Sequence, residues 1–426
     1  MVSGGAYGTE DIIHGAGYSR GILILLLTPV LWSLPTAFMV GELAGALPHE
    51  GGYYAWVRRG MGNFWGFQEA WLSLVASIFD MAIYPTLFVA YLGRLFPAVN
   101  LGHRALLIGL AVVAISALIN IAGIRIVAIS SLWLFLLLSA PFALIVILAP
   151  FKAGALGGAV TAPTTSTIGL VGGVLIAMWN YMGWDSASTI ATEVHEPQKT
   201  YPRAMLLAVL IVSLTYILPV LAMRITGVPS GAFETGSWAN LARLVGGRWL
   251  EVAMVVGGIV SAFGMLNALV MSYCRLPLAM AQDRMLPSAF AKLHPTTRAP
   301  WVAILVCGAA WALCVGLGFE RLITLDVLLS GVSVMLEFAA LIALRIREPQ
   351  LDRPFRVPGG TWGVCLIGVF PLLLLSFSVI NSAAERVWGV NGLALATMLV
   401  VAGFFVYWAK PTPTAESSLA PAPPES

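Results

Sequence analysis

The stretch Trp179-Asn180-Tyr181-Met182-Gly183-Trp184-Asp185 interrupts a long apolar segment that runs from about residue 166 to about residue 194. An aspartate at the centre of a membrane-spanning helix is disfavoured by about 2.5 to 3.5 kcal/mol, so such a residue normally faces a cavity or a polar partner. A second glycine-rich polar segment, Ser3-Gly4-Gly5-Ala6-Tyr7-Gly8-Thr9-Glu10-Asp11, opens the chain. Two interrupted apolar segments in corresponding places are typical of the substrate site of a secondary transporter.

The composition is that of a chain surrounded mostly by lipid. Hydrophobic residues make up 59% and charged residues 10% of the 426 residues, whereas a soluble domain carries about 25% charged residues. We therefore expect an all-α integral membrane protein. A net charge of +3 without a basic run argues against nucleic acid as a partner. The four cysteines lie in or beside apolar segments without metal-ligand spacing, so we expect no metal and no other cofactor.

Eleven apolar stretches are long enough to cross a bilayer, which takes about 20 residues. They cover residues 20–46, 64–96, 104–122, 126–150, 166–193, 203–224, 249–275, 301–318, 322–345, 361–381 and 388–408. Residues 6–16 would form the second half of one more helix, which predicts about twelve spans with the first half of span one absent.

The same pattern predicts how the chain is divided and oriented. Residues 1–410 would form a single transmembrane transporter domain, followed by a disordered tail at 411–426 that is rich in Pro, Ala and Ser. The 23 Lys and Arg residues are moderately enriched in the loops on one side of the membrane. The positive-inside rule places that side, and the tail with it, in the cytoplasm.

The two breaks suggest complementary binding chemistry. Hydrocarbon cannot satisfy the backbone groups that a helix break releases, so such backbone survives only where it lines a cavity or contacts a polar ligand. Free N–H groups at Ser3–Gly5, at the positive end of a helix dipole, suit a carboxylate. Free carbonyl groups near Trp179–Tyr181 suit a cation or an ammonium group.

Carboxylates inside the spans far outnumber basic residues at the same depth. Asp80 lies near the middle of residues 64–96, and Asp185 follows the second break. Glu10 and Asp11 follow the first break, where the outer mouth of the protein is expected. Such carboxylates bind a proton, bind a cationic ligand, or stay protonated and hydrogen-bonded to a neighbouring helix.

Other residues add weaker signals of the same kind. Tyr7, Trp179 and Tyr181 lie beside the breaks, where aromatic faces hold ammonium groups by cation–π attraction or pack as ordinary core residues. Glu337 lies deep enough in residues 322–345 to be a proton site. Carboxylates and aromatic residues together favour an organic amine as the ligand.

Four ordered motifs resemble those of the amino acid–polyamine–organocation superfamily. They are VSGGAYGTED (residues 2–11), ELAGALPHEGGYYAWVRRGMGNFWGFQEAW (Glu42–Trp71), WNYMGWDSASTIATEVHEPQKTYPRA (Trp179–Ala204) and CRLPLAMAQDRMLP (Cys274–Pro287). Within the superfamily, SIFDMAIYPTLF (residues 77–88) and GWDSASTIATEV (residues 183–194) most resemble the polyamine-uptake branch, close to the L-amino-acid transporter branch.

The resemblance implies a LeuT-type fold of two inverted five-helix repeats plus two helices, in which spans one and six are broken. Members of the superfamily bind substrate between the broken spans and transport it by alternating access. Carried over to this chain, the resemblance implicates the residues Ser3, Gly4, Gly5, Tyr7, Asp80, Trp179, Asn180, Tyr181 and Asp185. Several proton-coupled relatives carry a lysine in span five, but residues 126–150 contain none, so coupling through that lysine is excluded.

These observations predict a secondary active transporter in the cell membrane that moves polyamines or related organic cations and is coupled to protons. A transporter or exchanger of neutral or cationic amino acids is the first alternative. An amine-binding membrane protein that does not transport is the second, because half of span one is absent. The expected partners are a small organic amine or amino acid, protons and the lipid bilayer. We expect no enzyme, because the five histidines lie at span ends or in loops without metal or nucleophile spacing.

Overall fold

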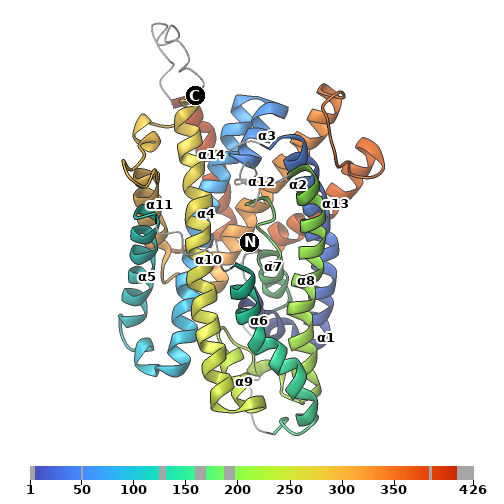
Figure 1. Ribbon diagram of the computed structural model, residues 1–426, viewed down its shortest axis with the longest axis vertical. Helices are drawn as coiled ribbons and strands as arrows, with labels where there is room; N and C mark the ends of the chain where they lie inside the picture. Colours follow the sequence, from blue (N-terminus) through green and yellow to red (C-terminus); the bar gives the residue numbers. More distant parts are fainter. Residues whose placement is uncertain are drawn as a thin grey trace.

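The computed structural model describes residues 5–48, 51–123, 131–158, 169–186, 197–382 and 386–409, and the predicted tail at 411–426 lies outside these ranges. Long helices run along the long axis of the molecule, with the short helix α3 (Gly52–Met61) at one end and α9 (Trp238–Gly246) at the other (Figure 1). Within the described ranges, nine helices are long and apolar enough to span a membrane, and two apolar helices are shorter. The prediction of an all-α integral membrane protein is confirmed.

The remaining helices follow the predicted apolar stretches closely. In chain order they are α1 (Glu10–Thr28), α2 (Leu34–Ala46), α4 (Asn63–Leu95), α5 (Arg104–Ile121), α6 (Ser131–Leu148), α7 (Gly169–Asn180), α8 (Pro197–Ile225), α10 (Arg248–Gln282), α11 (Trp301–Cys314), α12 (Phe319–Arg347), α13 (Gly360–Asn381) and α14 (Gly392–Ala409). A short π-helical segment, Pro29–Ser33, joins α1 to α2. The short helices α3 and α9 were not predicted.

The chain reverses inside α1 at Gly17, which has φ 72° and ψ 170°, far from helical values. A Cβ atom added at Gly21 would lie 3.5 Å from the Cα of Ile13. Eight residues of continuous helix would separate these two positions by about 12 Å, so the two pieces of α1 fold back on one another. The predicted division into a half-helix at 6–16 and a span at 20–46 is confirmed.

Helices at corresponding places in the two halves of the chain contact each other. α1 packs on α7, α2 on α8, α4 on α10 and α5 on α11. In the predicted order these are spans one and six, two and seven, three and eight, and four and nine. Contacts between four pairs of corresponding spans are the pattern expected of the inverted repeats in the LeuT-type arrangement.

The last predicted span, 388–408, was wrong at its start. Strands β1 (Arg386–Val387) and β2 (Val390–Asn391) form an antiparallel hairpin, and α14 begins after it. Trp388 and Gly389 have φ values of 50° and 81°, the left-handed conformation of a two-residue hairpin turn. The apolar residues that suggested a helix are therefore shared between a hairpin and the helix that follows.

Helix α11 is also shorter than the predicted span 301–318. Val315 leaves the helix with an extended backbone, and Gly316 and Gly318 have φ values of 99° and 92°. Glycine adopts such values without steric strain. These two glycines turn the chain from α11 into α12.

Candidate functional site

The two predicted breaks are present and lie against each other. Helix α7 ends at Asn180, and Gly183 follows with φ 90°. At the first break, Gly5 has φ 62° and precedes a single 3-10 turn, η1 (Ala6–Gly8). The side chain of Asn180 donates a hydrogen bond of 2.9 Å from Nδ2 to the carbonyl of Gly8. This bond ties one interrupted helix to the other.

A small cavity, with a volume of about 30 Å³, lies beside the second break. Its walls come from the break itself and from helices on both sides of it, chiefly α4 and α12. Three of its lining residues are carboxylates, Asp80, Asp185 and Asp326, and the described residues that line it include no Lys, Arg or His. Hydroxyl groups come from Thr36, Tyr53, Ser73, Ser186, Tyr273, Ser330 and Ser333. The cavity is therefore negatively charged whenever its carboxylates are ionised.

Asp80 is the centre of a hydrogen-bond network and is 2% exposed. Trp179 donates from Nε1 to Oδ1 at 3.0 Å, Tyr273 donates from its hydroxyl to Oδ2 at 3.1 Å, and the Tyr84 hydroxyl lies 3.3 Å from Oδ1. These donors come from α7, α10 and α4. Neutral donors orient a carboxylate without cancelling its charge, so Asp80 stays available to a cation.

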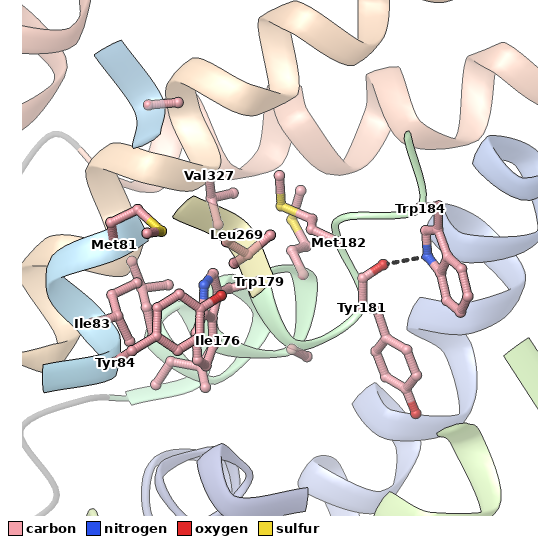
Figure 2. Packing of buried hydrophobic residues seen from close by; sticks show 14 of the residues in the cluster. Met81, Ile83, Tyr84, Ile176, Trp179, Tyr181, Met182, Trp184, Leu269 and Val327 are labelled. Carbon is pink, nitrogen blue, oxygen red and sulfur yellow. Dashed lines mark hydrogen bonds between the residues drawn. The ribbon is translucent and has the colours of Figure 1, made fainter. Parts of the chain in front are cut away.

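Trp179 and Tyr181 point in different directions (Figure 2). The ring of Trp179 lies beside that of Tyr84, with 6.3 Å between their centroids. Tyr181 donates from its hydroxyl to the carbonyl of Leu25 at 3.1 Å. Its own carbonyl accepts a bond of 2.7 Å from Nε1 of Trp184. Tyr181 therefore fixes the unwound segment against α1, whereas Trp179 supports the carboxylate network.

Tyr7 lies apart from the cavity in this structure. Its hydroxyl donates to the carbonyl of Leu138 at 2.9 Å. Its ring packs edge-on against Tyr91 and Phe142, with centroids 5.4 Å and 4.7 Å away. These contacts join the first break to α4 and α6.

The carboxylates that follow the first break hold the loop before α9. Oε1 of Glu10 accepts a bond of 2.6 Å from the Tyr91 hydroxyl and one of 3.2 Å from the backbone N–H of Gly236. Oδ2 of Asp11 accepts a bond of 2.8 Å from the Thr235 hydroxyl. Both contacts lie at the α9 end of the bundle, which is the outer mouth in the predicted orientation.

Two of the predicted contacts, Asp80 and Asp185, line the cavity. The others that the structure describes build or support the breaks around it; they are Gly5, Tyr7, Trp179, Asn180 and Tyr181. Ser3 and Gly4 lie outside the described residues.

The predicted contacts include no residue of α12, which contributes one wall of the cavity. Asp326, Ser330 and Ser333 line the cavity, and their spacing of four and three residues places them on one face of the helix. That polar stripe in an otherwise apolar span was a readable signal. Tyr273 gave no comparable signal, because tyrosines near span ends are common in membrane proteins.

A family model described as amino acid permease matches residues 1–409. The chain belongs to the amino acid permease family. This match confirms the superfamily resemblance of the four sequence motifs. The permease is therefore a multi-pass integral membrane transport protein for small organic molecules, not an enzyme.

Several similar proteins are themselves named as transporters. One from Arabidopsis thaliana, named a probable polyamine transporter, is 33% identical to the permease over 411 residues, which cover 95% of this chain and 84% of that one. A polyamine transporter of Oryza sativa subsp. japonica is 32% identical over 407 residues, covering 95% and 76%. An uncharacterized transporter of Mycobacterium tuberculosis is 29% identical over 394 residues, covering 88% and 82%.

Substituting alanine for Gly8 should disturb the network around Asp80 without touching the cavity. A Cβ atom at Gly8 would lie 2.9 Å from Cζ3 of Trp179, so the indole must shift and its bond to Asp80 must lengthen. Weakening one hydrogen bond to a charged group should lower substrate affinity by about tenfold. The measurement is the KM of uptake in liposomes. Gly308→Ala is the matched control, because the added Cβ would meet only Ala117 at 3.9 Å; an equal KM change in both variants would contradict the prediction.

Proposed function

We propose that the permease is a secondary active transporter of polyamines or related organic cations in the cell membrane, and that it works by alternating access. The observation that carries this proposal is the charge of the cavity. Asp80, Asp185 and Asp326 converge there, and no basic residue accompanies them among the described lining residues.

The energetics of buried charge favour a polycation over an amino acid. A buried carboxylate without a counter-charge is destabilised by several kcal/mol, and neighbouring carboxylates repel one another. A ligand with two or more ammonium groups relieves both effects through charge-assisted hydrogen bonds. A neutral amino acid would bring its own carboxylate into the same negative cavity. The names of the relatives from Arabidopsis thaliana and Oryza sativa agree with a polyamine substrate.

Aromatic side chains supply the second half of the expected recognition. Trp32, Tyr53, Trp184 and Tyr273 line the cavity beside the carboxylates. Aromatic faces attract ammonium groups by about 0.5 to 2 kcal/mol each. They also cover methylene groups, which alternate with the nitrogens of a polyamine. Carboxylates and aromatic rings in one cavity therefore match both parts of such a ligand.

Protons are the coupling ion in this proposal. A diamine neutralises two carboxylates, and the third carboxylate of the loaded site needs another positive charge. A proton supplies that charge without occupying space in the cavity. Substrate and proton then cross together, and an inward proton gradient drives accumulation.

The lipid bilayer is the proposed surrounding of the bundle. On α8, Leu207, Leu210, Leu214 and Leu218 follow one another at helical spacing and are 57%, 57%, 46% and 43% exposed. A continuous apolar stripe of this kind is stable against acyl chains and unstable in water.

The decisive test is uptake of labelled putrescine into liposomes with an inward proton gradient, in competition with spermidine, arginine and leucine. We expect putrescine to accumulate, spermidine to compete, leucine to have no effect, and a protonophore to abolish accumulation. Uptake of labelled leucine or arginine in the same liposomes, without putrescine entry, would establish an amino acid transporter instead. Putrescine binding without entry would establish an amine-binding membrane protein that does not transport.

A further inference from the structure

Two more buried carboxylates, Glu69 on α4 and Glu337 on α12, extend the negative charge of the cavity. Both residues are 0% exposed. Oε1 of Glu69 accepts hydrogen bonds from Ser73, at 3.2 Å, and from Ser333, and both serines line the cavity. Glu337 interacts electrostatically with Glu69 and with Asp185. The two glutamates therefore lie directly behind the serines at one end of the cavity.

The hydrogen bonding of these glutamates is incomplete. Among the described residues, neither carboxylate oxygen of Glu337 has a hydrogen-bond partner, and neither does Oε2 of Glu69. A fully buried carboxylate without donors is destabilised by several kcal/mol, and an apolar residue of similar volume would avoid that penalty. Packing therefore does not account for Glu337, whereas a bound proton or a cationic ligand would.

The carboxylates have the same spacing on both helices. Asp80 lies 11 positions after Glu69, and Glu337 lies 11 positions after Asp326. Eleven residues make about three helical turns and return to the same face of the helix, roughly 16 Å further along. Each helix therefore presents one carboxylate at either end of the same stripe.

The two stripes face each other in antiparallel register. Ser73 of α4 and Ser333 of α12 lie 3.1 Å apart, and Asp326 interacts electrostatically with Asp80. Asp80 and Asp326 thus form one level, and Glu69 and Glu337 form a second level about three turns away. Between them, Asp185 interacts electrostatically with carboxylates of both levels.

We propose that Glu69 and Glu337 form a second ammonium subsite, so that the permease favours linear polyamines long enough to reach it from Asp80. The proposal rests on the proposed function, polyamine transport, and adds the length of the preferred substrate. An extended chain covers about 1.2 Å per bond, which separates the two nitrogens of putrescine by about 6 Å and the terminal nitrogens of spermine by about 15 Å. Putrescine reaches from Asp80 toward Asp185, whereas spermine spans both levels and spermidine is intermediate.

The test compares inhibition constants of putrescine, spermidine and spermine against exchange of labelled putrescine in liposomes without a proton gradient. Glu337→Gln keeps the side-chain volume and removes a buried charge without donors, so it should fold. We expect the spermine inhibition constant to rise at least tenfold more than that of putrescine. Glu69→Gln is the second variant, and it keeps an acceptor for Ser73 and Ser333.

Glu251→Gln is the matched control, because Glu251 is also buried, at 2% exposed, but pairs with Arg248 at 2.8 Å at the start of α10. It should leave all three inhibition constants within about twofold of wild type. Equal losses for the three amines in Glu337→Gln, or no loss at all, would overturn the second subsite. Failure of the proposed function has a different signature, because the wild-type protein would then take up none of the three amines.

Discussion

Replacing Asp80 with asparagine is expected to lower kcat/KM for putrescine uptake at least 100-fold while the permease still folds. The substitution removes one charge from the cavity, and loss of one partner from a buried, hydrogen-bonded charge pair costs about 2 to 5 kcal/mol. The fold should persist because the asparagine oxygen can still accept the bond from Trp179. Its amide group can donate to the hydroxyl of Tyr273, which now donates to the carboxylate at 3.1 Å.

Uptake rates and thermal unfolding should be measured on the same preparation. Asp352→Asn is the matched control, because it makes the same chemical change at an exposed position outside the cavity. It should leave both uptake and Tm unchanged. Uptake by Asp80→Asn within threefold of wild type would remove Asp80 from the substrate site. A Tm drop that matches the loss of uptake would assign Asp80 a structural role instead.

Asp80 and Asp185 could be predicted as site residues because the linear sequence alone reveals them. A carboxylate inside an apolar span stands out in the sequence whatever the helices around it do, since lipid disfavours it. The two helix breaks could be predicted for the same reason, because Gly5 and Gly183 interrupt apolar segments directly. Both glycines have positive φ values in the structure, as an unwound segment allows.

The α12 wall could not be placed in the same way. Asp326 becomes a cavity residue only because α12 packs against α4 in a register that sets Ser333 opposite Ser73. The sequences of α4 and α12 do not predict that register. Glu69 was even harder to predict as a residue near the cavity, because it lies close to the start of its span, where a charged residue normally reaches water.

The direction of a side chain was the second property that the sequence could not predict. Tyr7 was predicted to contact substrate because it lies beside the first break, but its hydroxyl passes close to Gly257 of α10 and donates to Leu138. A Cβ atom at Gly257 would lie 2.0 Å from that hydroxyl. Tyr7 can point in this direction only because the residue at position 257, about 250 positions away in the sequence, is a glycine. Only the close packing of the folded structure reveals such a pairing.

Glu42 is a position where a single substitution should strongly affect stability. It is 0% exposed, and its Oε1 accepts a bond of 2.8 Å from Nε of Arg345. Its Oε2 accepts a bond of 2.7 Å from the backbone N–H of Val357, and Nε of Arg353 lies 3.4 Å from Oε1. The side chains of Arg345 and Arg353 are 8% and 4% exposed. The Glu42 carboxylate therefore neutralises part of two buried positive charges, and it joins α2 to α12 and to the loop after it.

Glu42→Ala is expected to lower the free energy of unfolding by about 3 to 5 kcal/mol, because it removes a buried counter-charge from Arg345 and Arg353, which then repel each other. In detergent this should lower Tm by on the order of 10 °C.

Arg59→Ala is the matched control for an ion pair that water screens. It breaks the pair of Arg59 with Glu348, whose side chains are 42% and 33% exposed. The hydrogen bond from Arg59 holds the pKa of the Glu348 carboxyl below its usual value, yet exposed pairs contribute only about 0 to 1 kcal/mol to stability. Equal Tm losses in the two variants would show that the buried arginines find other acceptors once Glu42 is gone. The junction of α2 with α12 would then rest on apolar packing, and the buried ion pair would be free to break and re-form as the helices move.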